Sequence, residues 1–219
     1  MIKFKFSKIF YAQINGGKIM QVKIIPAGIY DANCYILFDE STKEAAVIDP
    51  GGDADLILDE IKEIDADVKM ILLTHGHADH TGGVVELRKE FECNVYINEK
   101  DSEMINKNVP IYGKPTENGD KFISDGDVLP FSGTTIKCLE TPGHTPGGVC
   151  YLTDNVVFTG DTLFYRSIGR TDFEGGDYDT LINSINTKLM NLPDDTLVYT
   201  GHGPKTSIGF EKNNNPFLK

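Results

Sequence analysis

Several features that would assign this chain to a particular class of protein are missing from its 219 residues. No C-x-x-C pair occurs among the four cysteines, which predicts buried free thiols in a reducing compartment, not a disulfide framework; they are Cys34, Cys93, Cys138 and Cys150. No apolar run approaches the roughly 18 residues that a membrane-spanning helix needs, and no secretory leader pattern opens the chain. We therefore expect a soluble cytoplasmic protein that does not enter a membrane.

Positive charge is also scarce. Lys and Arg total 21 against 33 Asp and Glu, which gives a net charge of -12. Such a surface repels phosphate backbones, so the composition argues against a nucleic-acid partner. The length, with 40% hydrophobic residues, suits one well-cored domain or at most two small ones.

Histidine is rare, and its positions are not scattered. Only five occur in the chain. His75, His77 and His80 lie within six residues of one another, whereas His144 and His202 each lie in a turn rich in glycine and proline. None of the five is placed as an ordinary packing residue, so we expect them to act together.

Hydrophobic patterns predict two successive halves, each made of strands followed by helix and strand. Strands are predicted over 22–25, 34–38, 45–48, 68–73 and 95–97, and then over 128–131, 135–139, 149–152, 156–158 and 197–200. Helices are predicted over 54–65, 82–91, 101–106 and about 178–191. This order suggests two sheets packed together with helices outside.

The first residues differ from the rest in charge. Residues 1–19 hold four lysines and no acidic residue, and a clean strand pattern begins after Met20. We predict that 1–19 are an N-terminal extension of a single domain over 20–219. The alternative is an ordinary first strand with Phe4, Phe6 and Ile9 packed on the sheet.

The densest group of metal-ligand side chains lies in residues 74–83, T-H-G-H-A-D-H-T-G-G, directly after an apolar strand. Residues two apart on a helix point to opposite sides, so His75 and His77 can share one metal only from a loop. Four imidazole and carboxylate groups in six residues exceed what one tetrahedral ion with an open position uses, so two metals are predicted. Three more candidates follow predicted strands beside glycines: His144, Asp161 and His202.

This segment resembles the H-x-H-x-D-H signature of the metallo-β-lactamase fold superfamily, met by His75, His77, Asp79 and His80. The resemblance covers residue 20 to the C-terminus. It implies an α/β fold, a four-layer αββα sandwich of two mixed β-sheets, with a dimetal site at one edge. In hydrolases of the family, the first metal is bound by residues matching His75, His77 and His144. The second is bound by those matching Asp79, His80 and His202, and the residue matching Asp161 bridges both.

A dinuclear site of this kind predicts a metal-dependent hydrolase. Binding to a cation lowers the pKa of water to about 7, so a hydroxide shared by two cations is expected to attack an acyl carbon at neutral pH. Asp79 is placed to accept a hydrogen bond from that hydroxide and orient it. Two divalent ions are expected, with Zn favoured and Fe or Mn as alternatives.

The segment 162–173, T-L-F-Y-R-S-I-G-R-T-D-F, resembles the glyoxalase II-like hydrolases, in particular the short bacterial type without a helical C-terminal domain. The resemblance implies cleavage of a small thioester, as by a hydroxyacylglutathione hydrolase. Arg170 is then a candidate for binding a substrate carboxylate. The alternative is that Arg170 pairs with Asp172 and only rigidifies the loop. Asp177 is expected to cap the next helix.

Other functions remain open. Persulfide dioxygenases share the G-R-T-D-F segment but bind a single iron, here through His75 or His77 with His144 and Asp161. A lactonase, another hydrolase of the fold, an RNA-processing relative or an inactive metal-binding module are further alternatives. The acidic surface argues against RNA, and the complete ligand set argues against an inactive protein. The expected partner is a small-molecule thioester, and the expected state is a monomer or a small homo-oligomer.

Overall fold

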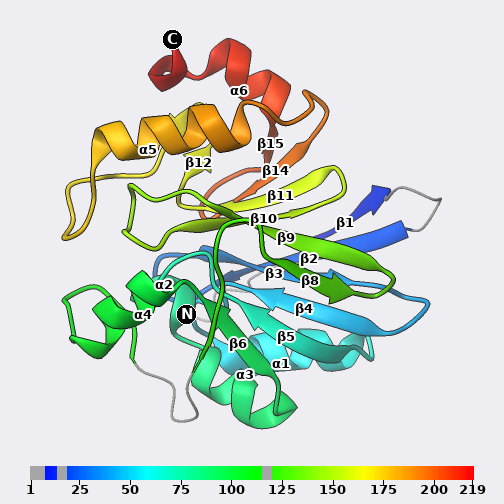
Figure 1. Cartoon of the computed structure of the whole chain (residues 1–219). Helices are drawn as coiled ribbons and strands as arrows, with labels where there is room; N and C mark the ends of the chain where they lie inside the picture. Colours follow the sequence, from blue (N-terminus) through cyan, green and yellow to red (C-terminus); the bar gives the residue numbers. More distant parts are fainter. Residues whose placement is uncertain (1–7, 14–18, 115–119) are drawn as a thin grey trace.

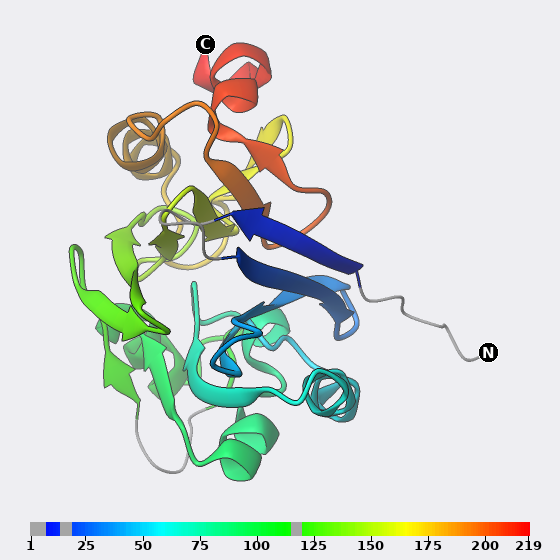
Figure 2. The same cartoon turned by 90° about the vertical axis from the view of Figure 1, so that its right-hand side faces the viewer.

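A computed structural model of the chain describes residues 8–13, 19–114 and 120–219. Two large β-sheets pack face to face, and helices cover the outer side of each (Figures 1 and 2). These are the four layers of an αββα sandwich, so the predicted fold class is confirmed.

Both large sheets are mixed. The first contains, in spatial order, β1 (Lys8–Gln13), β2 (Ile19–Ala27), β3 (Ala32–Phe38), β4 (Glu44–Ile48), β5 (Asp67–Leu72), β6 (Asn94–Ile97) and β7 (Lys121–Phe122). The second contains β15 (Thr206–Ser207), β14 (Leu197–Thr200), β11 (Val156–Gly160), β10 (Val149–Thr153), β9 (Thr134–Glu140) and β8 (Val128–Phe131). A small hairpin joins β12 (Leu163–Phe164) to β13 (Ser167–Ile168). Pairing is parallel from β4 through β7 and between β11 and β14.

The helices divide between the two outer faces. Helices α1 (Ala54–Glu63), α3 (Val84–Phe91) and α4 (Glu99–Asn106) pack on the first sheet, and the short α2 (Ala78–Thr81) precedes α3. Helix α5 (Tyr178–Ser184), its π-helical continuation Ile185–Leu189, and α6 (Ile208–Asn214) pack on the second sheet, and a 3-10 turn, Pro216–Leu218, closes the chain. No helix among the described residues is long and apolar enough to span a membrane.

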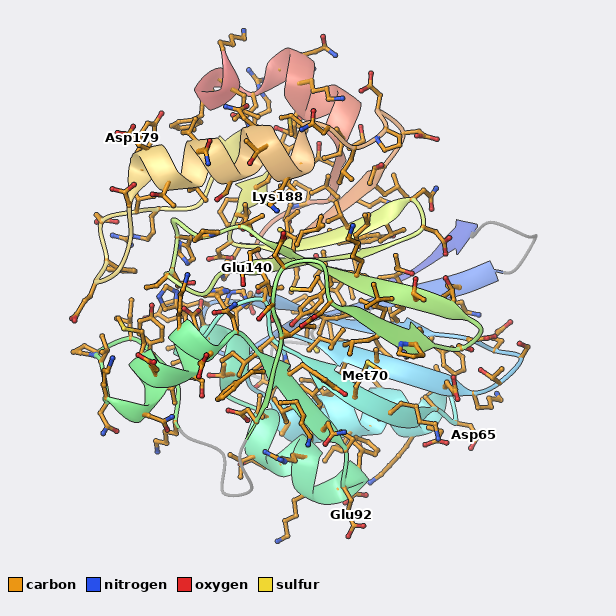
Figure 3. All side chains as sticks on the ribbon, in the orientation of Figure 1. Asp65, Met70, Glu92, Glu140, Asp179 and Lys188 are labelled. Atoms are coloured by element: carbon orange, nitrogen blue, oxygen red, sulfur yellow. The ribbon has the colours of Figure 1, made fainter. Side chains whose placement is uncertain are left out.

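The core lies in three layers, as the architecture requires. Between the sheets, Tyr35 lies against Phe158 with ring centroids 5.2 Å apart, and Met70 is buried in the same cluster. Separate apolar clusters fill the space between each sheet and its helices. Acidic side chains such as Asp65 and Glu92 lie on the outside, which accounts for the acidic surface (Figure 3).

Most predicted elements lie where the structure has them, and the exceptions are short. The helix predicted over 178–191 is correct in place, but its second half is π-helical. Helix α6 was not predicted, because its sequence I-G-F-E-K-N-N holds one glycine and two asparagines, which are poor helix formers. It forms because Ile208 is buried against the second sheet and the Ser207 side chain accepts a hydrogen bond from the Phe210 amide.

The N-terminal prediction is only partly addressed by the structure. Strand β1 pairs antiparallel with β2 along the edge of the first sheet, with Lys8 opposite Ile24. Residues 1–7 and 14–18, and with them Phe4 and Phe6, lie outside the described part of the chain. The assignment of 1–19 to an extension stays a prediction.

Candidate metal centre

The seven predicted ligand residues come from strand ends of both sheets and lie together at one edge of the sandwich. His75, His77, Asp79 and His80 follow β5 of the first sheet. The other three follow β9, β11 and β14 of the second sheet: they are His144, Asp161 and His202. Loops at the ends of rigid strands therefore supply every member of the group.

The loop after β5 turns sharply, which places side chains two residues apart on one side. His77 has extended backbone angles and is the N-cap of the four-residue helix α2, so the helix begins after it. Gly76 precedes it, and a Cβ there would lie 2.9 Å from the Tyr112 ring. The loop geometry predicted for His75 and His77 is thus produced by a glycine turn followed by a short helix.

One group of donor atoms lies around His144. Its Nε2 is 3.0 Å from Nδ1 of His77, and the ring of His75 is 4.9 Å from that of His144 between centroids. Nε2 of His75 is buried without a hydrogen-bond partner. Each of the three residues offers a nitrogen within 4.8 Å of the others.

A second group lies beside it. Nε2 of His202 is 3.3 Å from Oδ2 of Asp79 and 3.3 Å from Nε2 of His80. Asp161 lies between the two groups: its Oδ1 is 3.4 Å from Nε2 of His80, and its Oδ2 is 3.5 Å from Nε2 of His144. One carboxylate therefore faces both groups, as the resemblance implied for this position.

The donor atoms fit divalent metal ions. Ligand atoms bound at 2.0–2.1 Å in a tetrahedron lie about 3.3–3.4 Å apart, and the distances of 3.0 to 3.9 Å between neighbouring donor atoms lie around this spacing. The buried, unpartnered atoms include Nε2 of His75 and Oδ1 of Asp161. Unpartnered polar atoms in a protein interior are costly, so an ion that binds them removes that cost.

The charges of the site support the same conclusion. Burial lowers the pKa of His77 to about 3, and the neighbouring His144 adds to this shift, so the imidazole is neutral, as a ligand must be. Burial also disfavours a charge on His80, but Asp161 and Asp49 outweigh it and raise the pKa of His80. This second group thus attracts positive charge, which a metal cation supplies.

Supporting residues orient two of the imidazoles. Nδ1 of His80 donates to Oδ2 of Asp49 at 3.0 Å, and Nδ1 of His144 donates to the carbonyl oxygen of Arg170 at 2.7 Å. Each interaction leaves the Nε2 lone pair of the same ring free to bind a metal. Asp49 also lies within ligand distance of His75 and His80, but its oxygens already accept bonds from Thr74 and His80, so we assign it an orienting role.

Asp101 connects the two loops that carry the first group. Its side chain is 0% exposed, and its Oδ2 accepts from the Gly76 amide at 2.8 Å while its Oδ1 accepts from the Gly147 amide at 2.6 Å. Charge-assisted bonds of this kind are stronger than those between neutral groups. Asp101 therefore holds the His77 loop and the His144 loop at a set separation.

Asn33 supports the loop that carries His202, as Asp101 supports the loops of the first group. Its Nδ2 donates to the carbonyl oxygens of Thr200 at 2.9 Å and Gly203 at 3.0 Å, on either side of His202. Gly201 lies under Asp161, and a Cβ at this glycine would overlap Oδ1 of that residue. A strand of the first sheet thus fixes a ligand loop of the second.

Sequence reasoning did not find Asp49, Asp101 or Asn33. A signal existed for Asp49, which follows β4 directly and precedes Pro50 and two glycines, the same context as the predicted ligands. Asp101 and Asn33 have no such signal, because an acidic residue in a first helical turn and an asparagine near a hairpin are ordinary local features.

Arg170 lies on the loop that supports His144, and its guanidinium is engaged. Its Nε and one terminal nitrogen each donate to Asp172 at 2.7 Å, and the group stacks 3.8 Å from the centre of the Phe173 ring. The pairing considered as the alternative is therefore present, and substrate binding by Arg170 stays a prediction. The Asp177 side chain accepts from the Thr180 amide and caps α5, which confirms the predicted cap.

Comparison with known proteins agrees with this geometry. The metallo-beta-lactamase superfamily profile matches residues 27–202. The chain belongs to this superfamily, and it is a metallo-hydrolase.

Three similar proteins illustrate the range of the family. Hydroxyacylglutathione hydrolase GloC of Haemophilus influenzae is 43% identical over 211 residues, covering 91% of this chain and 98% of that protein. The crystal structure of BLEG-1 B3 metallo-beta-lactamase has a TM-score of 0.84 and 38% identity, with 90% of this chain and 99% of that chain covered. The crystal structure of ETHE1 from Myxococcus xanthus has a TM-score of 0.76 and 32% identity, with 89% of this chain and 83% of that chain covered.

Proposed function

We propose that this protein hydrolyses a small thioester, in the manner of the hydroxyacylglutathione hydrolase to which it is 43% identical. The proposal assigns His75, His77 and His144 to a first divalent cation and Asp79, His80 and His202 to a second. Asp161 is assigned to both. Zn is the metal we favour, with Fe or Mn as alternatives.

The observation that carries the proposal is the position of Asp161 between two groups of donors. Its Oδ1 faces His80 at 3.4 Å and its Oδ2 faces His144 at 3.5 Å. Two cations held by these residues would activate water as a nucleophile at neutral pH and would stabilise the oxyanion and the thiolate leaving group.

The residues of the chain set the direction of approach. The side chain of Asp79 is 23% exposed and that of His202 is 31% exposed. The histidines that follow β5 are buried: His75, His77 and His80. Substrate and water therefore reach the site from the side of Asp79 and His202. Burial raises the pKa of Asp79, but the hydrogen bond with His202 and the charge of His80 lower it below its usual value. The carboxylate is therefore ionised and able to accept a hydrogen bond that orients a water molecule.

A thioester panel assayed on protein of measured metal content tests the proposal. We expect two metals per chain and release of free thiol. One iron per chain with oxygen uptake on glutathione persulfide would instead support a persulfide dioxygenase, and cleavage of lactones without thioesters would support a lactonase. We also propose that Arg170 binds a carboxylate of the substrate.

We also propose a cytoplasmic protein, supported by four free thiols. Residues 20–219 are proposed as the hydrolase domain and 1–19 as an extension. Intact-mass measurement of natively expressed protein tests this boundary, and an intact Met1 would argue against it. Gel filtration with light scattering tests the proposed monomer or small homo-oligomer.

A further inference from the structure

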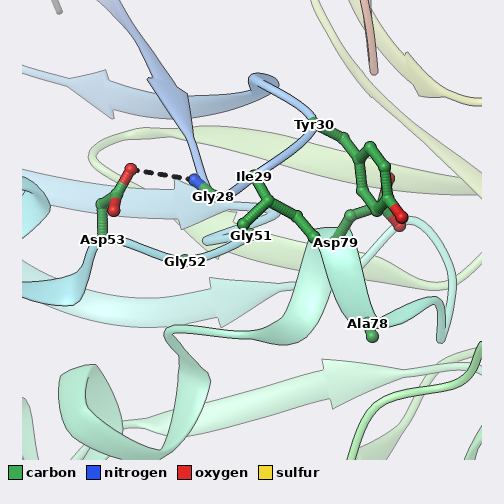
Figure 4. A pocket seen from close by; sticks show the side chains of 8 residues that line it. All are labelled: Gly28, Ile29, Tyr30, Gly51, Gly52, Asp53, Ala78 and Asp79. Atoms are coloured by element: carbon green, nitrogen blue, oxygen red, sulfur yellow. Dashed lines mark hydrogen bonds between the residues drawn. The ribbon is translucent and has the colours of Figure 1, made fainter. Parts of the chain in front are cut away.

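A pocket opens beside Asp79, on the side from which substrate approaches. It encloses about 410 Å³ and lies between the β2–β3 connection and the start of α2 (Figure 4). Its lining consists of Gly28, Ile29, Tyr30, Gly51, Gly52, Asp53, Ala78 and Asp79. Because Asp79 belongs both to the pocket and to the second donor group, a molecule in the pocket lies next to a residue of the predicted metal centre.

The pocket is lined by backbone at three glycines, where close packing leaves no room for a side chain. A Cβ on Gly28 would lie 2.7 Å from the Gly51 carbonyl oxygen, and one on Gly52 would lie 2.8 Å from the Gly28 Cα. A Cβ on Gly51 would overlap the carbonyl oxygen of Asp79. The Gly28 amide donates to Oδ2 of Asp53 at 3.0 Å, which ties the β2–β3 connection to the residues before α1 (Figure 4).

The outer wall is apolar and faces solvent. Ile29 is 87% exposed and the adjacent Tyr30 is 67% exposed, the highest values among the large hydrophobic residues described. Single exposed apolar residues are common, but two neighbours that line a pocket beside a reactive centre indicate a binding surface. Figure 4 shows both side chains projecting from the β2–β3 connection over this pocket.

We infer that this pocket binds the acyl group of the thioester and selects substrates whose acyl group is uncharged and apolar. The inference rests on the proposed thioester hydrolysis. The pocket lining holds two carboxylates, Asp53 and Asp79, and no cationic side chain. These lining residues offer no cationic partner for the carboxylates of glutathione, which places the thiol portion outside and the neutral acyl portion inside.

A series of acyl thioesters of one thiol tests the inference. Acetyl, butanoyl and hexanoyl thioesters of glutathione are compared on metal-loaded protein. For the native chain we expect kcat/KM to rise two- to fourfold with each added methylene, because each buries apolar surface against Ile29 and Tyr30. In the double variant Ile29→Ser, Tyr30→Ser, the ratio of kcat/KM for hexanoyl over acetyl should fall to near one.

A matched control separates a local effect from a general one. Val128 is 52% exposed on β8, outside the pocket lining, and Val128→Ser should keep the native ratio. A double variant that retains the native ratio would overturn the inference while leaving thioester hydrolysis intact. A native chain that prefers acetyl would do the same. If metal-loaded protein cleaves no thioester, the proposed function and the inference fail together.

Discussion

Asp49→Asn tests whether a buried carboxylate outside the ligand set controls metal affinity. Oδ2 of Asp49 accepts from Nδ1 of His80 at 3.0 Å and from the Thr74 hydroxyl at 2.6 Å, and its Oδ1 accepts from the Thr74 amide at 2.7 Å. Asparagine keeps the shape but replaces one accepting oxygen with an NH₂ group. In either orientation at least one of these donors then faces another donor.

The expected magnitude follows from the bond that is lost. A hydrogen bond to a charged group contributes about 1.5–3 kcal/mol. Loss of a carboxylate that orients a metal-bound histidine typically weakens metal binding about 10- to 100-fold, which corresponds to about 1.4–2.7 kcal/mol. The two ranges agree, so we expect the affinity for the metal bound by His80 to fall within them.

Titration of metal-free protein against a chromophoric chelator measures this affinity. Asp39→Asn is the matched control, because Asp39 is 1% exposed and accepts from the Ser41 hydroxyl at the far end of β3 from the metal centre. It should lower the free energy of unfolding without changing metal affinity. An Asp49→Asn affinity within twofold of the native value, or an equal loss in the control, would refute the orienting role.

Three further predictions concern the bridging carboxylate, the ion pair of the neighbouring loop and the buried thiols. Asp161→Asn should reduce the occupancy of both metals and thioester hydrolysis together, measured by elemental analysis and initial rates; full activity would contradict a dinuclear site. If Arg170 acts only through its pair with Asp172, then Arg170→Ala, Asp172→Asn and the double variant should show the same KM, whereas a higher KM confined to variants lacking the guanidinium would indicate substrate binding. Burial raises the pKa of Cys150 from its usual value of 9.0 to about 12. Between these pH values the thiol is protonated in the folded protein, whereas in the unfolded chain it is ionised. The free energy of unfolding should accordingly fall by about 1.4 kcal/mol per pH unit for this thiol between pH 9 and pH 12, and Cys150→Ala should show a shallower fall in urea titrations.

The sequence was sufficient to predict the layers of the fold and the residues that meet at its edge. Strands such as 34–38 and 149–152 are apolar enough to be recognised alone, and predicted ligands such as His144 follow strand ends beside glycines. Helix α6 was missed because its own sequence disfavours a helix, and burial of Ile208 decides the outcome. Local pattern and tertiary packing disagree there, and packing prevails.

The supporting residues were beyond prediction for a different reason. Asp101 supports the site because its carboxylate accepts hydrogen bonds from the amides of Gly76 and Gly147. Asn33 supports it because its side-chain amide donates to the carbonyl oxygens on either side of His202. Their separations along the chain reach 46 residues for Asp101 and 170 for Asn33. No local spacing encodes such a meeting of loops, and only the arrangement of two sheets creates it.

The glycines that surround the metal centre limit how the protein can change. At Gly76 and Gly201, a single added methyl group would strike Tyr112 or Asp161, so a substitution at either position would displace a residue of the site or one that packs against it. Variation in substrate preference must therefore arise at the rim, where Ile29 and Tyr30 face solvent and can be replaced at little cost to folding. Diversification of this scaffold, natural or engineered, is expected to leave the interior constant and to proceed through its surface loops.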